Sequence, residues 1–228
     1  MIKTNLDIIK ANVKKACDLC GRNPDDVLIL AVTKNHTADE INRAIDLGIT
    51  DIGENRVQEL LQKYDDVKKG VRWHIIGHLQ TNKVKYIADK VCMIHSVDSV
   101  KLALEIDKQC KKLGKVMDIL IEINSGEENK NGIEPSQAYA VIEEVSKLQN
   151  VCIKGLMTMA PLGADDSKLK EVFSSLYNLS VDIAKKKYDN VFMEHLSMGM
   201  SGDYMAAIIE GATIIRPGRS LFGTAKSL

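Results

Sequence analysis

The sequence lacks an excess of charge of either sign. Its 228 residues include 31 lysines and arginines against 31 aspartates and glutamates, so the formal net charge is zero. It also lacks any apolar run near the roughly 20 residues of a membrane span, and residues 1–22 lack the compact apolar core of a signal peptide. We therefore expect a cytoplasmic protein whose partners are small molecules rather than nucleic acid or membranes.

The five cysteines lack the number and spacing of a disulfide framework. Cys17 and Cys20 have the spacing of a redox or zinc motif, but they continue a stripe of Leu6, Ile9 and Val13 that is typical of one helix face. This pattern favours core packing over redox or metal chemistry. The sequence also has no linker rich in proline, glycine or serine, so we expect residues 1–228 to form a single domain.

Short β-like runs alternate with longer helical patterns along the whole chain. The first run, VLILAVTK, is apolar on both faces, which is typical of a parallel strand. Thr37 and Glu40 then form a capping box that begins a helical pattern, and Gly48 ends it. With the first run at 27–34, eight strands are predicted, the others being 50–53, 72–77, 91–97, 116–124, 151–159, 191–198 and 213–218.

Eight strand–helix units predict an α/β protein, a single (β/α)8 TIM barrel with an extra N-terminal helix. An open doubly wound sheet is the alternative, because periodicity alone does not establish closure. In a barrel, the carboxyl ends of the strands meet at one mouth, and Lys34 ends the first strand on its inward face. Such a lysine can attack a carbonyl group or pair with a carboxylate such as Glu54 or Glu122.

Two segments near the C-terminus have the character of a phosphate site. SMGMSGD places Gly199, Ser201 and Gly202 where a helix starts, and RPGR, residues 216–219, follows the last strand. Backbone N–H groups at a helix start bind phosphate, and barrels often use the loops after strands 7 and 8 for this purpose. A lysine opposite such a site suits a phosphorylated carbonyl compound.

Seven motifs in series resemble those of the pyridoxal phosphate homeostasis protein family, formerly labelled as proline synthetase co-transcribed proteins. The resemblance covers residues 27–224 and implies a barrel of pyridoxal 5'-phosphate (PLP) fold type III, like the N-terminal domain of alanine racemase. It also implies PLP as the cofactor. The motifs are AVTK, GENRVQE, WHIIGHLQTNK, IHSVDS, GLMTM, LSMGMSGD and RPGRSLFG.

Site residues follow from the same resemblance. It implies that Lys34 holds PLP as a Schiff base, that Ser201 and the backbone near Gly218 hold the phosphate, and that Arg216 faces the pyridine nitrogen. For His78, a structural role in capping the next turn is the alternative. The implied cofactor-binding set is Lys34, Asn55, His78, Met200, Ser201, Arg216, Gly218 and Arg219.

The resemblance implies a carrier rather than an enzyme. A permanent cation at the pyridine nitrogen disfavours ring protonation, so the cofactor is a poor electron sink. We expect a monomeric PLP-binding protein that stores, buffers or delivers the cofactor, contacts PLP-dependent apoenzymes transiently and affects amino-acid and keto-acid metabolism. One alternative is a small PLP-dependent amino-acid racemase or decarboxylase with Tyr204 or His195 as base. Another is an aldolase-type barrel in which Lys34 attacks a sugar phosphate.

Overall fold

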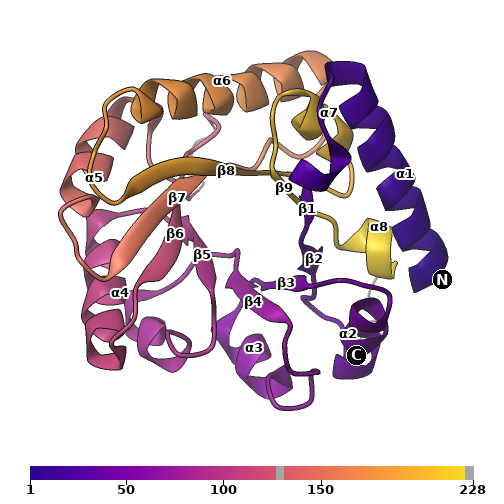
Figure 1. Cartoon of the computed structure of the whole chain (residues 1–228), viewed down its shortest axis with the longest axis horizontal. Coiled ribbons are helices and arrows are strands. Elements are labelled where there is room, and N and C mark those ends of the chain that lie inside the picture. Colours follow the sequence, from indigo (N-terminus) through magenta and orange to yellow (C-terminus); the bar gives the residue numbers. More distant parts are fainter. Residues whose placement is uncertain (127–130, 224–228) are drawn as a thin grey trace.

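The strands of the protein form a closed parallel barrel with helices around it (Figure 1). The structure, a computed structural model, describes residues 1–126 and 131–223. Its nine strand segments pair in parallel in the order β1-β9-β8-β7-β6-β5-β4-β3-β2. The two ends of this order, β1 (Leu28–Ile29) and β2 (Ala31–Val32), are successive parts of one run, so the sheet closes on itself. The predicted barrel is confirmed, and the open sheet is wrong.

The remaining strands lie at or close to the ranges predicted from the sequence. Apolar residues cover both faces of the barrel wall, as expected for strands buried on both sides. Leu30, Val32, Met157 and Ile214 belong to a cluster that fills the interior, whereas Ala31 packs outward with the helices. These strands are β3 (Asp51–Glu54), β4 (Arg72–Ile75), β5 (Met93–Val97), β6 (Met117–Glu122), β7 (Val151–Met157), β8 (Val191–Met200) and β9 (Ile214–Arg216).

Helix ends follow the capping signals in the sequence. The predicted capping box of Thr37 and Glu40 is present at the start of α2. Ser99 caps α4 (Val100–Leu113), whose C-cap residue Gly114 has the left-handed conformation, and Asp165 caps α6 (Asp166–Ala184). Short 3-10 helices occur at 24–26, 81–86 and 135–137. The α-helices are α1 (Ile2–Cys20), α2 (Ala38–Asp46), α3 (Val57–Lys63), α4 (Val100–Leu113), α5 (Ala138–Val145), α6 (Asp166–Ala184), α7 (Tyr204–Ile209) and α8 (Arg219–Phe222).

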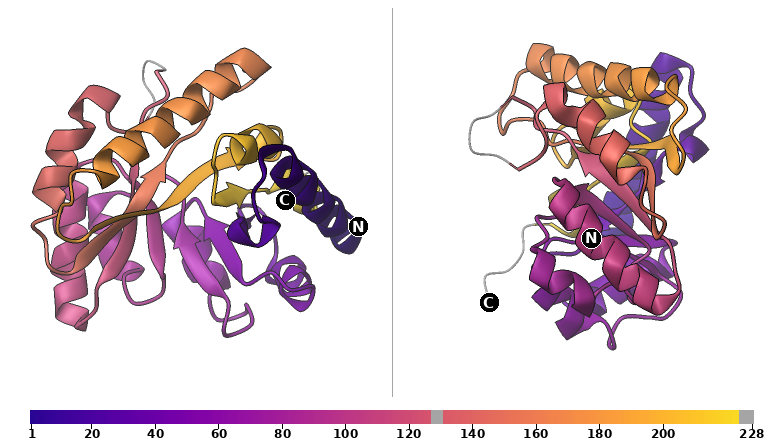
Figure 2. Two further views of the ribbon diagram at one scale, coloured as in Figure 1. Left: turned by 45° about the horizontal axis from the view of Figure 1, so that its top comes forward. Right: turned by 90° about the vertical axis from the view of Figure 1, so that its left-hand side faces the viewer.

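The extra helix α1 packs against α7 and α8, so the N-terminal and C-terminal elements lie side by side (Figure 2). Its buried face includes Leu6, Ile9, Val13 and Cys17, as the stripe in the sequence predicts. Cys17 is fully buried and Cys20 donates to the Ala16 carbonyl oxygen. Among the helices of the described residues, none is both long and apolar enough to cross a lipid bilayer.

Leu30 joins β1 to β2 and is fully buried in the interior cluster. Leu30→Ala should therefore lower the free energy of unfolding by about 3 kcal/mol, through lost burial and the cavity left behind. Urea unfolding followed by circular dichroism measures this change. Leu19→Ala, at a side chain that is 69% exposed, is the control and should be nearly neutral. Equal effects of the two substitutions would contradict the placement of Leu30.

Candidate functional site

A cavity of about 630 Å³ opens at the carboxyl ends of the strands. His78 is not among the residues that line it; its imidazole is half exposed, with Nδ1 3.2 Å from Asp98 Oδ2. The cavity does bring together the other seven residues of the implied cofactor-binding set, which come from four separate segments of the chain: Lys34, Asn55, Met200, Ser201, Arg216, Gly218 and Arg219.

Lys34 lies two residues after β2, at the rim of this cavity. Its side chain is exposed, and no residue in the described part of the chain forms a hydrogen bond or ion pair with its ammonium group. The buried carboxylate of Glu54 instead accepts hydrogen bonds from Lys63 Nζ at 2.7 Å and from Thr33 Oγ1 at 2.8 Å. Burial still raises the pKa of Glu54, against the opposing effect of Lys63. The pairing of Lys34 with Glu54, one of the two alternatives that the sequence left open, is therefore absent.

The Ser201 hydroxyl is the meeting point of three hydrogen-bond donors on the cavity wall. Ser201 Oγ lies 3.1 Å from the Gly218 and Ser220 backbone nitrogens and 3.1 Å from Ser220 Oγ. The loop reaches this position through Gly199, whose φ is +92° and where a Cβ would lie 2.8 Å from Tyr204 Cα. Converging N–H and O–H groups of this kind can bind an anion.

Arg216 places a buried cation at the wall of the same cavity. It is 3% exposed, and its guanidinium donates to Ser197 Oγ at 2.7 Å and to the Thr158 carbonyl oxygen at 2.9 Å. Burial lowers the pKa of Arg216 to about 10, while the carboxylates of Asp203 and Glu122 act in the opposite direction. The group therefore remains charged at neutral pH, and its two hydrogen bonds fix the plane of the guanidinium.

Behind Arg216, the hydrogen bonds continue through Ser197 to His95, His74 and Asp51. Sequence reasoning did not single out these residues for a site. The only signal was a histidine within each of two apolar strands, RWHIIG and VCMIHSV, and a lone strand histidine is usually a core residue with a satisfied hydrogen bond. Their partners come from other strands, so the network depends on the register of the closed barrel.

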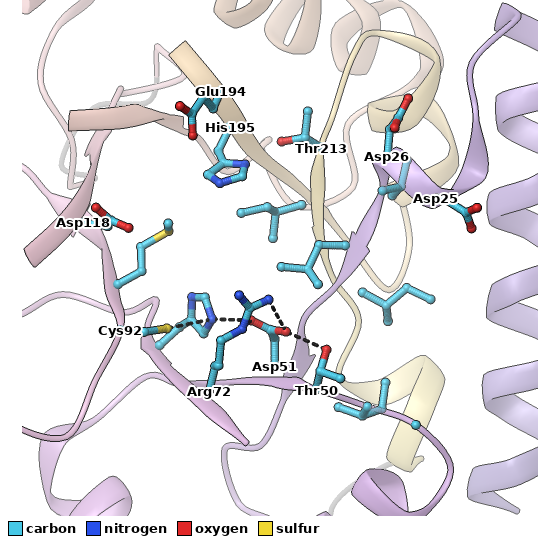
Figure 3. Close-up of a pocket in the computed structure, with 18 of the residues that line it drawn as sticks. Asp25, Asp26, Thr50, Asp51, Arg72, Cys92, Asp118, Glu194, His195 and Thr213 are labelled. Atoms are coloured by element: carbon cyan, nitrogen blue, oxygen red, sulfur yellow. Dashed lines mark hydrogen bonds and ion pairs between the residues drawn. The ribbon is translucent and has the colours of Figure 1, made fainter. Parts of the chain in front are cut away.

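A second cavity, of about 670 Å³, lies at the opposite end of the barrel, where Asp51 and Arg72 begin their strands (Figure 3). His195, considered above as a catalytic base, lines this cavity and not the one that contains Lys34. Tyr204, the other base considered, is buried, and its hydroxyl accepts a hydrogen bond from Asn12 Nδ2 at 2.8 Å. Neither side chain lines the Lys34 cavity.

The fold and the site together define a barrel of the alanine racemase class. Residues 4–226 match the family described as alanine racemase, N-terminal domain. A structure of an unknown protein from Bifidobacterium adolescentis superposes with a TM-score of 0.92 at 32% identity, covering 96% of this chain and 94% of that one.

The relatives narrow this class to one family. A pyridoxal phosphate homeostasis protein from Aquifex aeolicus is 43% identical over 223 residues, which is 97% of both chains. PipY from Synechococcus elongatus, solved with PLP bound, is 33% identical with a TM-score of 0.82, covering 93% of this chain and all of PipY. The chain belongs to the pyridoxal phosphate homeostasis protein family.

Glu122 ends β6 with a side chain that is 3% exposed. Burial, assisted by Asp98 and opposed by Arg216, raises the pKa of Glu122 from an ordinary 4.5 to about 7. The native state holds the Glu122 proton more tightly than the unfolded state does. The resulting stabilisation of the native state is complete below pH 4.5 and is lost as the pH rises through 7.

Glu122→Gln should remove this dependence in the ligand-free protein. Between pH 4.5 and 8, the free energy of unfolding of the parent should fall, relative to that of the variant, by an amount on the order of 3 kcal/mol. Urea unfolding at a series of pH values measures both curves. Parallel curves would contradict a buried, protonated Glu122.

Proposed function

We propose that this protein binds PLP in the Lys34 cavity and takes part in PLP homeostasis within one domain of residues 1–228. The observation that carries the proposal is that seven residues from four segments meet around one cavity with an amine, an anion-binding loop and a buried guanidinium. The names of the relatives and the PLP in PipY support the choice of cofactor.

The residues present fit the three chemical groups of PLP. The Gly218 and Ser220 N–H groups would hold the phosphate dianion beside Ser201, in exchange for the hydrogen bonds that they make within the protein. Arg216 would donate to the pyridine nitrogen, and Lys34 would face the aldehyde. When bound, PLP supplies an aldehyde that condenses with an amine, with loss of water, and a ring that accepts electrons. Apolar side chains, among them Val32, Ile76 and Met159, line the space for the ring.

Two features support a carrier rather than an enzyme. Arg216 stays cationic at neutral pH, which disfavours a proton on the pyridine nitrogen and weakens the ring as an electron sink. His195 and Tyr204 do not line the cavity, so neither is placed as a base for a racemase or decarboxylase. We accordingly propose that a monomer stores, buffers or delivers PLP, through transient contact with PLP-dependent apoenzymes.

Borohydride reduction of the PLP-loaded protein should fix the cofactor on Lys34, because among the described residues this is the lysine that lines the cavity. Peptide mapping by mass spectrometry identifies the labelled residue. Lys154 is engaged with Glu194 at 3.2 Å, and Lys83 lies in the 3-10 helix 81–86; neither lines the cavity. A label on Lys83 or Lys154 would overturn the assignment, and a colourless protein that takes up no label would favour the aldolase-type alternative.

Lys34→Ala should lose the yellow colour yet still bind PLP, because the phosphate donors and Arg216 act independently of the amine. Ser201→Asp should bind PLP at least about tenfold more weakly, since its carboxylate can take the Gly218 and Ser220 N–H groups and repels the phosphate. Ser201→Ala, which leaves both N–H groups free, is the matched control and should bind nearly as well as the parent. Equilibrium dialysis measures the affinity of each variant for PLP. Parent-like binding by Ser201→Asp, with no binding by Lys34→Ala, would refute the phosphate loop.

A further inference from the structure

A hydrogen-bonded network runs through the inside of the barrel from one open end to the other. It consists of Asp51, His74, His95, Ser197 and Arg216, which lie on five different strands, and is here called the interior network. The successive distances are 2.8 Å from Asp51 Oδ1 to His74 Nε2, 2.9 Å from His74 Nδ1 to His95 Nε2, 2.8 Å from His95 Nδ1 to Ser197 Oγ and 2.7 Å from Ser197 Oγ to Arg216 Nη1. Every member is 3% exposed or less.

Asp51 anchors the far end as a carboxylate that only accepts. Burial alone would raise its pKa, but hydrogen bonds from His74, Arg72 and Thr50 outweigh burial and lower the pKa of Asp51 to about 2. Arg72 approaches both oxygens at 2.8 Å, and Thr50 donates at 2.7 Å (Figure 3). His74 must therefore donate from Nε2, because the fixed charge at Asp51 has no proton to give.

The direction of every other hydrogen bond follows from this end. Burial, together with the neighbouring His74 and Arg216, lowers the pKa of His95 well below its usual range, so His95 is neutral. In one direction, His74 Nδ1 accepts from His95 Nε2–H, and His95 Nδ1 accepts from the Ser197 hydroxyl. The opposite direction needs a doubly protonated His74, a second cation in the interior that already holds Arg216.

We propose that Asp51, His74 and His95 are positioning residues for Arg216, acting through the Ser197 hydroxyl. With its hydrogen committed to His95, Ser197 Oγ presents its remaining lone pairs to the guanidinium and holds it at the cavity wall. Hydrogen bonds aligned in one direction also polarise and strengthen one another. If the protein binds PLP as proposed above, residues at the end of the barrel opposite the cavity determine how strongly Arg216 binds the pyridine nitrogen.

The first test needs no ligand. The chain has five histidines, so long-range proton–nitrogen NMR can assign each ring with histidine variants. His74 and His95 should each carry one proton, on Nε2, at neutral pH. A proton on Nδ1 of either ring, or two protons on His74, would overturn the proposed direction. This result stands whether or not the protein binds PLP.

The second test is a double-mutant cycle between Asp51→Asn and Ser197→Ala, read by PLP binding in equilibrium dialysis and by the tautomers of the rings. Each variant should weaken PLP binding by about tenfold, and the double variant should lose little more, because both changes break one network. Additive losses would overturn the coupling. His195→Asn is the control: this side chain lines the same far cavity and makes no hydrogen bond within the described residues, so binding should stay at the parent value. Circular dichroism confirms folding, and if Asp51→Asn does not fold, His95→Gln replaces it in the cycle.

A parent protein that binds no PLP at all would refute the proposed function but not the network, which the NMR measurement tests alone. Normal PLP binding by the parent, together with unchanged tautomers in Asp51→Asn, would refute the network but not the proposed function.

Discussion

The buried charge of Arg216 is the constraint on which the site depends. A guanidinium that is 3% exposed loses most of its hydration, and such a loss is tolerated only where hydrogen bonds replace it. Ser197 of β8 and Thr158, the residue after β7, supply two of these hydrogen bonds, and Asp203 supplies compensating negative charge. The position of this cation thus requires three adjacent strands in their native register.

The two polar ends of the barrel differ in whether their charged groups have partners within the protein. At the cavity end, the Lys34 ammonium group has no partner among the described residues, and the Ser201 loop gathers N–H and O–H donors around a single hydroxyl. At the far end, Arg72, Thr50 and His74 satisfy the carboxylate of Asp51 with four short contacts. A lysine amine without a partner beside clustered N–H and O–H donors at one end, and a satisfied carboxylate at the other, favour a ligand site at the cavity end.

Much of the fold and of the candidate site could be predicted from the sequence. Strict alternation of apolar runs with helical patterns predicted eight strands within a few residues, because parallel strands buried on both faces need such runs. Lys34, Ser201 and Arg216 could be grouped because carboxyl ends of strands converge in a barrel. The interior network could not be found in this way, since His74 and His95 meet only after closure sets the register of β4 against β5 and brings β8 across the interior. The sequence equally could not show that Glu54 pairs with Lys63 rather than Lys34.

The proposed function requires that one cavity accepts one PLP molecule, held by a lysine, a phosphate loop and a buried arginine. Titration of the purified protein with PLP, followed by visible absorption, tests it most directly. We expect a yellow band that saturates at one PLP per chain and persists without turnover when amino acids are added. A protein that stays colourless, with PLP fully removed by dialysis, would contradict it.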